Sequence, residues 1–469
     1  MHTLKITLPE EEKEEITRIV TRFIDNGFEC YLVGGSVRDL LLDHEIYDFD
    51  FATNALPGEV IKMFRRVIPT GIKHGTVSVL SGNRSFEITT YRSDGRYIDG
   101  RRPESVQFSQ SLEEDVKRRD FTINGLAYDV LKEEVIDYNN GLEDLGNRII
   151  RTIGDPIERF SEDGLRTYRA CRFAAKLNFE IDAATFEAIP KTLHIAKKVS
   201  VERVRDELNK LLEAEKPSVG IEYLRKAGLL ELFLPELAQC HGVEQNRFHV
   251  YDVYYHSIYS CDAAPRDQLM LRIASLLHDI GKVPSRRVGN DEEATFYNHE
   301  IIGARMVRRI MKRLKYSNEA VDRVNNLITN HMFHYTDDWT DGAVRRFMRK
   351  VGVENIDELL VLRLADRKGN GSREGLPAPI KKLQKRIEKI IEEENAITVK
   401  DLKINGYVIM EKFSLAPGPI IGKILHELLE SVLDDPEINK EETLIDMTGN
   451  ILRQLKKDKE EQEECNGHE

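Results

Sequence analysis

The sequence lacks three features that would each define a class of protein. No apolar run approaches the length of a membrane span, and the opening residues, MHTLKITLPEEEKEE, are too acidic for a signal or transit peptide. The five cysteines are scattered and form no CxxC pair, so neither a zinc ribbon nor a disulfide framework is expected. These absences favour a reduced, cytoplasmic protein with no membrane partner.

Positive charge is also in short supply. The chain has 69 Lys and Arg residues against 81 Asp and Glu residues, a net charge of −12. This balance argues against a protein that coats nucleic acid indiscriminately, although a local basic stripe is enough to engage phosphates. Basic segments occur at residues 117–119, 305–315, 345–350 and 381–386, and each also fits a solvated helix face. The charge therefore suits an enzyme that grips one RNA end.

The length and the hydrophobic patterns predict several domains. A chain of 469 residues is too long for one compact core. We expect an α+β fold, with a head that contains a small mixed sheet at residues 1–150. All-helical units are expected at residues 151–247, 248–371 and 372–469, and one expected helix runs from Phe160 to Leu177. The segment GNGSREGLPAP, from Gly369, is the expected linker, and the charged end from Lys456 is expected to be disordered.

The segment LVGGSVRD, which begins at Leu32, is the most informative part of the chain. Its apolar start predicts a buried strand that Gly34 and Gly35 end, and Ser36 is expected to cap the helix that follows. A glycine-rich turn between a strand and a helix can cradle phosphate, because backbone N–H groups point at the anion.

The next expected strand, in YDFDFAT, carries Asp48 and Asp50. Residues two apart on a strand project from the same face, so both carboxylates would lie together. Two hard oxygen ligands beside a phosphate cradle predict a Mg²⁺ site for phosphoryl transfer. The strand-like segment FEITTYR could bring Glu87 to the same site, and a surface strand position explains Glu87 equally well.

GGSVRD followed by DFD resembles the signature of the DNA polymerase β-like nucleotidyltransferases. The likeness is to the bacterial tRNA CCA-adding enzymes and their poly(A) polymerase relatives, and it covers most of the chain. It implies a polymerase β-like head in which Asp48, Asp50 and Glu87 are catalytic. It also implies that the nucleotide triphosphate is held by Gly34, Gly35, Ser36 and Arg38.

Two further segments continue the resemblance. KRRDFTINGLA resembles the RRDFTINAMA motif, with Gly125 in place of alanine, and implies that Arg119 and Asp120 recognise the ribose. SVERVRDELNKLL, from Ser200, resembles the last motif of this region, and we interpret it as structural. The loop DGRYIDGRRPE, from Asp94, resembles a loop needed to add the final A, and its Arg101 and Arg102 could reach the nucleotide or the RNA.

RFSEDGLRTYRACRF matches the EDxxR motif of the family. We expect Glu162, Asp163 and Arg166 within one helical turn, with Asp163 and Arg166 as neighbours on one face. The resemblance implies that this pair reads the base edge of CTP or ATP, and that Arg169 also binds the nucleotide. In isolation, the same spacing would indicate only a salt bridge within a helix.

A second constellation lies in the helical unit after residue 248. The segments YYHS, SLLHDIGK, FYNHEIIGA, LITNHMFH and RLADR resemble the HD phosphohydrolase superfamily. The ligands implied for a two-metal site are His256, His278, Asp279, His299, His331 and Asp366. Mixed imidazole and carboxylate ligands suit Mn, Fe, Ni or Zn better than Mg, and a bridging hydroxide could attack a phosphoester. A lone histidine on a helix is usually a packed core residue, and whether this site turns over a substrate stays open.

These observations lead to one hypothesis with two rivals. The chain is predicted to be a template-independent tRNA nucleotidyltransferase that adds or repairs the 3′-terminal CCA with CTP and ATP. It would use Mg²⁺ in the head and a transition metal in the HD unit, with no obligate protein partner. The nearest rival is an A-only tRNA nucleotidyltransferase or a poly(A) polymerase. A rival of another class is an HD phosphohydrolase with an RNA-binding head.

Overall fold

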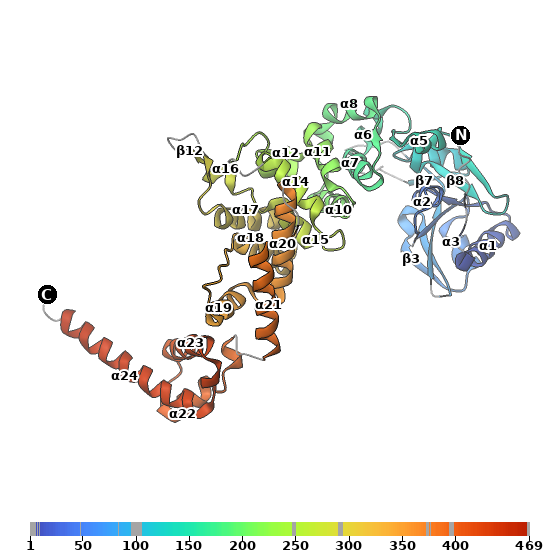
Figure 1. Ribbon diagram of the computed structural model, residues 1–469. Helices are drawn as coiled ribbons and strands as arrows, with labels where there is room; N and C mark the ends of the chain where they lie inside the picture. Colours follow the sequence, from blue (N-terminus) through green and yellow to red (C-terminus); the bar gives the residue numbers. More distant parts are fainter. Residues whose placement is uncertain are drawn as a thin grey trace. The chain divides into compact units, whose positions relative to one another are not determined.

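The computed structural model describes most of the chain. The described residues are 6, 8, 10–46, 48–82, 84–94, 106–245, 250–288, 294–371, 375, 377–393 and 398–466. They form two compact units (Figure 1): unit 1 contains residues 1–243, 265–272 and 310–316, and unit 2 contains residues 244–264, 273–309 and 317–469. No helix that the structure describes is both long and apolar enough to cross a bilayer.

Unit 1 begins with a seven-stranded mixed sheet in the order β3-β4-β5-β2-β1-β8-β9. The strands are β1 (Cys30–Val33), β2 (Phe49–Thr53), β3 (Val67–Gly71), β4 (Thr76–Ser81), β5 (Arg84–Thr90), β8 (Leu126–Asp129) and β9 (Glu134–Asp137). Only β2 and β5 run parallel, and the other pairs are antiparallel. The predicted small mixed sheet is confirmed.

Five helices and a short ribbon surround this sheet. The helices are α1 (Glu10–Asp25), α2 (Gly35–Leu41), α3 (Pro57–Met63), α4 (Leu112–Lys117) and α5 (Gly141–Asn147), and β6 (Arg92–Asp94) pairs with β7 (Val106–Phe108). Apolar residues alternate along β2, so Phe49 and Phe51 are buried while Asp50 between them is partly exposed. Phe86 of β5 contacts both rings, and this packing fixes β2 against β5.

The rest of unit 1 is helical apart from a short parallel pair, β10 (Ile149–Ile150) and β11 (Glu180–Ile181). Its helices are α6 (Pro156–Glu162), α7 (Leu165–Leu177), α8 (Ala183–Lys191), α9 (Leu193–Ala196), α10 (Val201–Leu212), α11 (Pro217–Lys226), α12 (Leu230–Phe233) and α13 (Pro235–Ala238). The buried helix α7 packs against α10 and α11.

The prediction of a single helix from Phe160 to Leu177 is wrong, because two helices, α6 and α7, occupy this segment and are separated by a short non-helical turn. Asp163 has extended backbone (φ −144°, ψ 107°), and Gly164 begins the next helix. A Cβ on Gly164 would lie 2.8 Å from the carbonyl oxygen of Ile195 and 2.9 Å from the backbone of Ala196. The close approach of α9 therefore requires glycine at this break.

Unit 2 is built from helices, several of which carry the predicted metal ligands. They are α14 (Val253–Ala263), α16 (Lys282–Ser285), α18 (Asn318–Asn330), α19 (Asp341–Val351), α20 (Ile356–Gly369), α21 (Ala378–Glu392), α22 (Gly406–Phe413), α23 (Pro419–Asp434) and α24 (Glu441–Asn466). Helices α15 (Leu269–Leu277) and α17 (His299–Arg313) have residues in both units, since residues 265–272 and 310–316 belong to unit 1. A short ribbon, β12 (Arg287–Val288) with β13 (Ala294–Thr295), precedes α17. The buried helices α14 and α20 pack along each other.

The end of the chain differs from its prediction. The charged segment from Lys456, predicted to be disordered, continues helix α24 as far as Asn466. Its Lys, Glu and Gln residues are good helix formers, and the apolar first half of α24 packs on α22 and α23 through Leu444. The helix is therefore started by packing and extended by local propensity.

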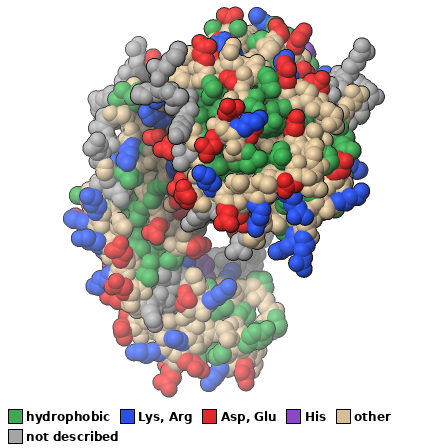
Figure 2. All heavy atoms as spheres, turned by 90° about the vertical axis from the view of Figure 1, so that its right-hand side faces the viewer, with side chains coloured by type: hydrophobic (Ala, Val, Ile, Leu, Met, Phe, Trp, Pro, Cys, Tyr) green, Lys and Arg blue, Asp and Glu red, His purple; other side chains and the backbone are tan. Residues whose placement is uncertain are grey.

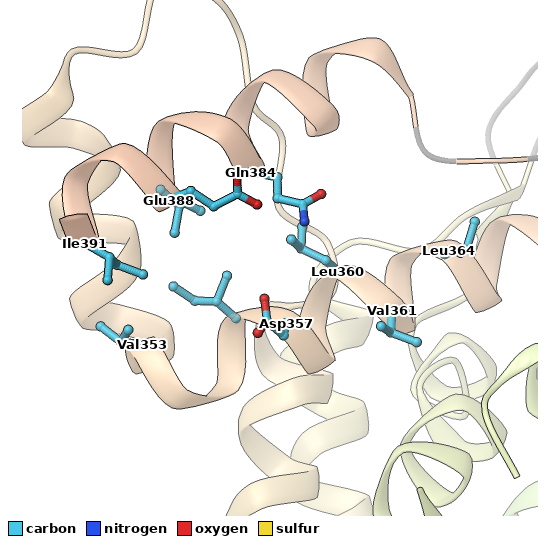
Figure 3. Close-up of a pocket in the computed structure, with 10 residues that line it drawn as sticks. Val353, Asp357, Leu360, Val361, Leu364, Gln384, Glu388 and Ile391 are labelled. Atoms are coloured by element: carbon cyan, nitrogen blue, oxygen red, sulfur yellow. The ribbon is translucent and has the colours of Figure 1, made fainter. Parts of the chain in front are cut away.

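An apolar groove separates α20 from α21. Val353, Leu360 and Ile391 line it from the 3₁₀ turn before α20, from α20 and from α21, as Figure 3 shows. Asp357 and Glu388 add two carboxylates to the same groove.

Candidate functional site

The predicted strand–glycine–helix turn is confirmed in unit 1. Gly34 joins β1 to α2 with a positive φ of 69°, a conformation that favours glycine. A Cβ on Gly34 would lie only 2.6 Å from Nη1 of Arg119. The turn therefore favours glycine, and any side chain at this position would also displace the guanidinium that lies against it.

The prediction that Ser36 caps the helix is wrong, because the N-cap position belongs to Gly34. The Ser36 hydroxyl lies inside α2 and bonds to β2 instead. Its Oγ donates to the carbonyl oxygen of Asp48 at 3.1 Å and accepts from the backbone N–H of Asp50 at 3.1 Å. One side chain thus fixes the backbone on both sides of the strand entry that carries the two aspartates.

Three carboxylates gather at this entry. Asp48 is exposed, Asp50 is partly buried, and Glu87 lies opposite Asp50 in the parallel register of β2 and β5. Burial raises the pKa of Asp50 to about 6, and the charges of Glu87 and Asp48 add to this effect against the opposing charge of Arg119. Mutual repulsion of hard oxygen ligands is relieved by a divalent cation, so this donor set fits Mg²⁺.

Arg119, predicted to bind ribose, lies between the glycine turn and a buried acid. Its Nη2 donates to Oδ2 of Asp115 at 3.1 Å, and Asp115 also pairs with Arg118. Burial disfavours the charged form of Asp115, but the two guanidiniums together hold its pKa below the usual range. Arg119 is thus a fixed cation next to Gly34 and within electrostatic reach of Asp50.

Asp120, the predicted partner of Arg119, is buried and already bonded. It accepts from Nε of Arg169 at 2.6 Å and from Nδ2 of Asn124 at 3.0 Å. Burial would raise the pKa of Asp120, but the Arg169 guanidinium and the Asn124 amide hold it at about 2. Arg169 therefore contacts the predicted ribose-binding segment directly.

Arg38 lies in the interior, with 3 % of its surface exposed. Its guanidinium forms two parallel bonds to the Asp39 carboxylate, at 2.8 and 2.9 Å, and donates to Oδ1 of Asn124. It also lies 5.0 Å from the centre of the Phe173 ring of α7. These contacts hold Arg38 in the protein interior, where it stabilises the turn between β1 and α2.

The prediction that Asp163 and Arg166 are neighbours on one helix face is wrong, and the two residues have separate partners. Arg166 pairs with Glu162 and donates to the carbonyl oxygen of Arg118 at 3.1 Å. Asp163 lies in the break between α6 and α7 and accepts from Nη2 of Arg203 at 2.8 Å. Because the extended backbone of Asp163 ends α6 and α7 begins only after it, the two residues do not share a helix face.

Two arginines at this site were missed from the sequence. Arg159 donates to the carbonyl oxygens of Lys117, Arg118 and Ile153, and so joins α6 to the segment before Arg119. Arg203 belongs to SVERVRD, which we had interpreted as structural. Arg159 and Arg203 each lie in a motif quoted above, and this was the available signal. Their bonds to Arg118 and Asp163, however, span 41 and 40 residues of the sequence, so spacing did not reveal their roles. The predicted loop residues Arg101 and Arg102 lie outside the described residues.

The six predicted HD ligands converge in unit 2, and Asp279 lies at their centre. Its Oδ2 is 3.2 Å from Nε2 of His256 and 3.2 Å from Nε2 of His278. The second carboxylate, Asp366 on α20, is 3.2 Å from Nε2 of His256. These four residues form one half of a potential metal centre.

The other oxygen of Asp279 faces the other half. Its Oδ1 is 3.3 Å from Nε2 of His299 and 3.8 Å from Nε2 of His331. The centre is almost fully buried, with exposures between 0 and 9 % for all six side chains. Asp279 therefore offers one oxygen to each half, which is the arrangement of a bridging carboxylate.

The backbone orients three of the four histidines. Nδ1 of His278, His299 and His331 each lies 2.7–2.8 Å from the carbonyl oxygen three residues earlier. This bond places the proton on Nδ1 and leaves Nε2 as the ligand atom. Nε2 of His331 is buried and has no hydrogen-bond partner among the described residues, and burial lowers the pKa of this histidine to about 3. Imidazole nitrogens and carboxylate oxygens that converge in this way fit divalent transition metals.

Three family models match parts of the chain. They are "Poly A polymerase head domain" at residues 30–151, "Probable RNA and SrmB- binding site of polymerase A" at residues 178–240, and "HD domain" at residues 247–370.

One relative and one solved structure match over nearly the full length, and a second relative matches a shorter part at higher identity. A CCA-adding enzyme from Streptococcus suis is 34% identical over 448 residues, which cover 95% of this chain and 98% of the relative. A CCA-adding enzyme from Lactobacillus helveticus is 54% identical over 187 residues, or 40% of this chain and 47% of that one. The crystal structure of the Bacillus stearothermophilus CCA-adding enzyme in complex with CTP is 28% identical and aligns with a TM-score of 0.73, covering 96% of this chain and 100% of that structure. The chain belongs to the family of CCA-adding enzymes.

Proposed function

We propose that this chain adds or repairs the 3′-terminal CCA of tRNA with CTP and ATP, without a nucleic-acid template. The observation that carries this proposal is the carboxylate cluster of Asp48, Asp50 and Glu87 next to the Gly34 turn, in a chain that resembles CCA-adding enzymes over its full length. A poly(A) polymerase or an A-only enzyme would share the head, but the full-length relatives reported above are CCA-adding enzymes.

Asp48 and Asp50 are the proposed Mg²⁺ ligands, with Glu87 as the third carboxylate. Bound Mg²⁺ would activate the tRNA 3′-hydroxyl and neutralise the charge of the leaving pyrophosphate. The residues of the chain itself would position the metal ligands and the triphosphate. Ser36 holds the backbone of both aspartates, and the turn at Gly34 and Gly35 offers backbone N–H groups to the triphosphate.

We infer that Asp163 and Arg166 read the base, and that Arg119 and Asp120 recognise the ribose. A carboxylate accepts from the amino group of C or A, and a guanidinium donates to a ring acceptor. In this structure Asp163 is held by Arg203 and Arg166 by Glu162, so each must exchange a protein partner for the base. Glu162 and Arg169 would act beside them, Arg169 through its bond to Asp120.

A phosphohydrolase activity in unit 2 is the second proposed function. The observation that favours it is the convergence of four histidines and two aspartates around the two oxygens of Asp279. These residues would hold Mn, Ni, Fe or Zn, and a bound pair of ions would supply a hydroxide for attack on a phosphoester. Because Asp48, Asp50 and Glu87 are all present in the head, we disfavour the rival in which the chain is only a phosphohydrolase with an RNA-binding head.

We also propose limits for the domains and a cellular location for the chain. Boundaries near residues 150, 247 and 371 are supported by family matches at 30–151, 178–240 and 247–370. A reducing, cytoplasmic location is supported by Cys30, Cys171, Cys240 and Cys261, which are buried and free of disulfides.

Primer extension tests the main proposal. tRNAs that end before CCA, after C and after CC are incubated with CTP and ATP, of which one at a time is labelled, and the wild type is expected to complete CCA from all three. Asp50→Ala should lower extension by roughly a hundredfold or more, because it removes a proposed metal ligand. Asp25→Ala, an exposed aspartate at the end of α1, is the matched control and should extend normally. Addition of A alone, or of a long A tract, would overturn the CCA assignment.

A further inference from the structure

A pocket of about 390 Å³ in unit 2 is lined by sequence neighbours of two of the metal-centre histidines. Its walls come from the segments that carry two of the histidines. Ile301 follows His299 by two residues, and Asn330 and Met332 flank His331 on either side. Because neighbouring Cα atoms are about 3.8 Å apart, the backbone of this wall lies within a few ångströms of the backbone that carries His299 and His331.

One wall of the pocket is aromatic. Phe333 and Trp339 line it, and each contacts Phe347, with ring centres 5.2 and 5.8 Å apart. Phe333 and Trp339 are only partly buried, so faces of both rings are available. Flat aromatic faces in a partly open pocket favour a flat ligand such as a nucleobase, whose stacking is worth about 1–3 kcal/mol.

Asn330 supplies one directed polar atom. Its side chain is 7 % exposed, and its Nδ2 donates to the backbone oxygen of Asn326 at 3.0 Å and to Oδ1 of Asn326 at 2.6 Å. Nδ2 of Asn326 in turn donates to the carbonyl oxygen of Val351, so neither amide can be turned around. Oδ1 of Asn330 is left buried, with no hydrogen-bond partner among the described residues. It calls for a donor from the ligand.

The charges of the pocket favour a base over a phosphate. The carboxylate of Glu300 lines it, and the guanidinium of Arg346 is already paired with Glu430 and Asp434. Lys350 is exposed, where water and salt screen its charge. A phosphate would therefore lie at the metal centre, and an uncharged group with a donor edge would lie in the pocket.

We propose that this pocket binds a base with an exocyclic amino group, cytosine or adenine, and so selects the nucleotide whose phosphoester reaches the metal centre. The amino group donates to Oδ1 of Asn330 while the ring stacks on Trp339 or Phe333. The proposal rests on the phosphohydrolase function proposed above. For a 2′,3′-cyclic phosphate, the oxygen of one water joins phosphorus, one ester P–O bond breaks, and the released ribose oxygen takes a proton.

Trp339 makes the pocket directly observable, since it is the single tryptophan of the chain. The full-length protein is titrated with cytidine, uridine, adenosine and inosine, which carry no phosphoester, while the Trp339 fluorescence is recorded. Cytidine and adenosine are expected to bind about tenfold tighter than their oxo counterparts, which is the effect of one satisfied buried acceptor. Equal dissociation constants within both pairs of the wild type would overturn the proposal without any variant.

Two variants assign the selectivity to one atom. Asn330→Leu removes the acceptor and should make cytidine and uridine bind equally. Thr329→Val is the matched control on the same wall, because its hydroxyl is already bonded to the carbonyl oxygen of Asn325, and it should keep the preference. Discrimination that survives in Asn330→Leu would overturn the role of Asn330.

Hydrolysis separates this proposal from the function on which it rests. With Mn²⁺-loaded protein, the ratio of kcat/KM for 2′,3′-cyclic CMP to kcat/KM for 2′,3′-cyclic UMP should fall to about one in Asn330→Leu. The wild type should also hydrolyse bis(p-nitrophenyl) phosphate, which has no base, so this ester reports the activity of the metal centre by itself. Selective nucleoside binding with no hydrolysis of any ester would support the pocket and reject the phosphohydrolase function. Hydrolysis of both cyclic nucleotides at equal rates, with no selective binding, would reject the pocket alone.

Discussion

The hydroxyl of Ser36 bonds to the backbone on both sides of the segment that carries Asp48 and Asp50. Removing it should loosen both proposed Mg²⁺ ligands without removing either. We expect Ser36→Ala to lower kcat for nucleotide addition by about ten- to a hundredfold and to raise the Mg²⁺ concentration needed for half-maximal activity. Steady-state kinetics at several Mg²⁺ concentrations measure both quantities.

Ser85→Ala is the matched control for this prediction, because Ser85 is an exposed serine on β5. It should leave the Mg²⁺ dependence unchanged. If Ser36→Ala showed a normal Mg²⁺ dependence, the hydroxyl would have only a packing role.

At the level of residues, the sequence predicted the local backbone around the site better than it predicted the partners of the side chains. Gly34, Asp48 and Asp50 could be placed because a turn and a strand are local structures with clear spacing. The bonds of Ser36 to β2 and of Asp163 to Arg203 join residues 12 to 40 positions apart. Such partners are chosen by tertiary packing, which spacing along the chain does not report.

The break between α6 and α7 is the element on which the position of Asp163 depends. Gly164→Ala would place a methyl group 2.8–2.9 Å from the backbone of Ile195 and Ala196, which cannot rotate away. We expect a loss of about 1–3 kcal/mol in the free energy of unfolding, together with weaker discrimination against UTP and GTP. Urea denaturation and nucleotide competition measure the two effects.

Gly146→Ala provides the comparison, since Gly146 lies in α5 and a Cβ there would meet nothing within 4 Å. Alanine should be neutral at this position or stabilise the protein by up to about 1 kcal/mol. Equal stability of both variants would mean that α9 moves aside to make room for the new methyl group.

Periodicity predicted the helical character of this region but not its interruption. The apolar spacing from Phe160 to Leu177 is continuous, and a single glycine inside such a pattern is commonly tolerated. The break follows from the approach of α9, which lies about 30 residues further along the chain. Local propensity also explains why the charged end of α24 is helical, although its polar composition had predicted disorder.

At the scale of the molecule, the two candidate centres belong to different compact units and use different ligand chemistry. We expect His278→Ala combined with Asp279→Ala to lower the bound transition metal and to abolish hydrolysis of cyclic phosphates. Addition of CCA should persist, because its proposed Mg²⁺ ligands all lie in unit 1. Metal analysis and both assays on one preparation check this prediction. Loss of CCA addition in a folded variant would show that the units are coupled.

The order of the HD ligands could be predicted because each lies in a short, recognisable segment. The sequence did not show that Asp279 divides its two oxygens between two sets of histidines, since this depends on how α14, α17, α18 and α20 pack. The same holds for the pocket at Asn330, whose walls come from three separate helical segments.

The buried ligand set has a consequence for what this centre can retain. Two divalent cations carry four positive charges, and Lys282, 2.7 Å from Asp279, adds a fifth. Asp279 and Asp366 return only two negative charges, and burial makes the imbalance costly. A doubly loaded centre therefore depends on an anion to complete it. The phosphoester that is to be cleaved can serve as this counter-ion, so the second metal ion and the substrate should hold each other in place.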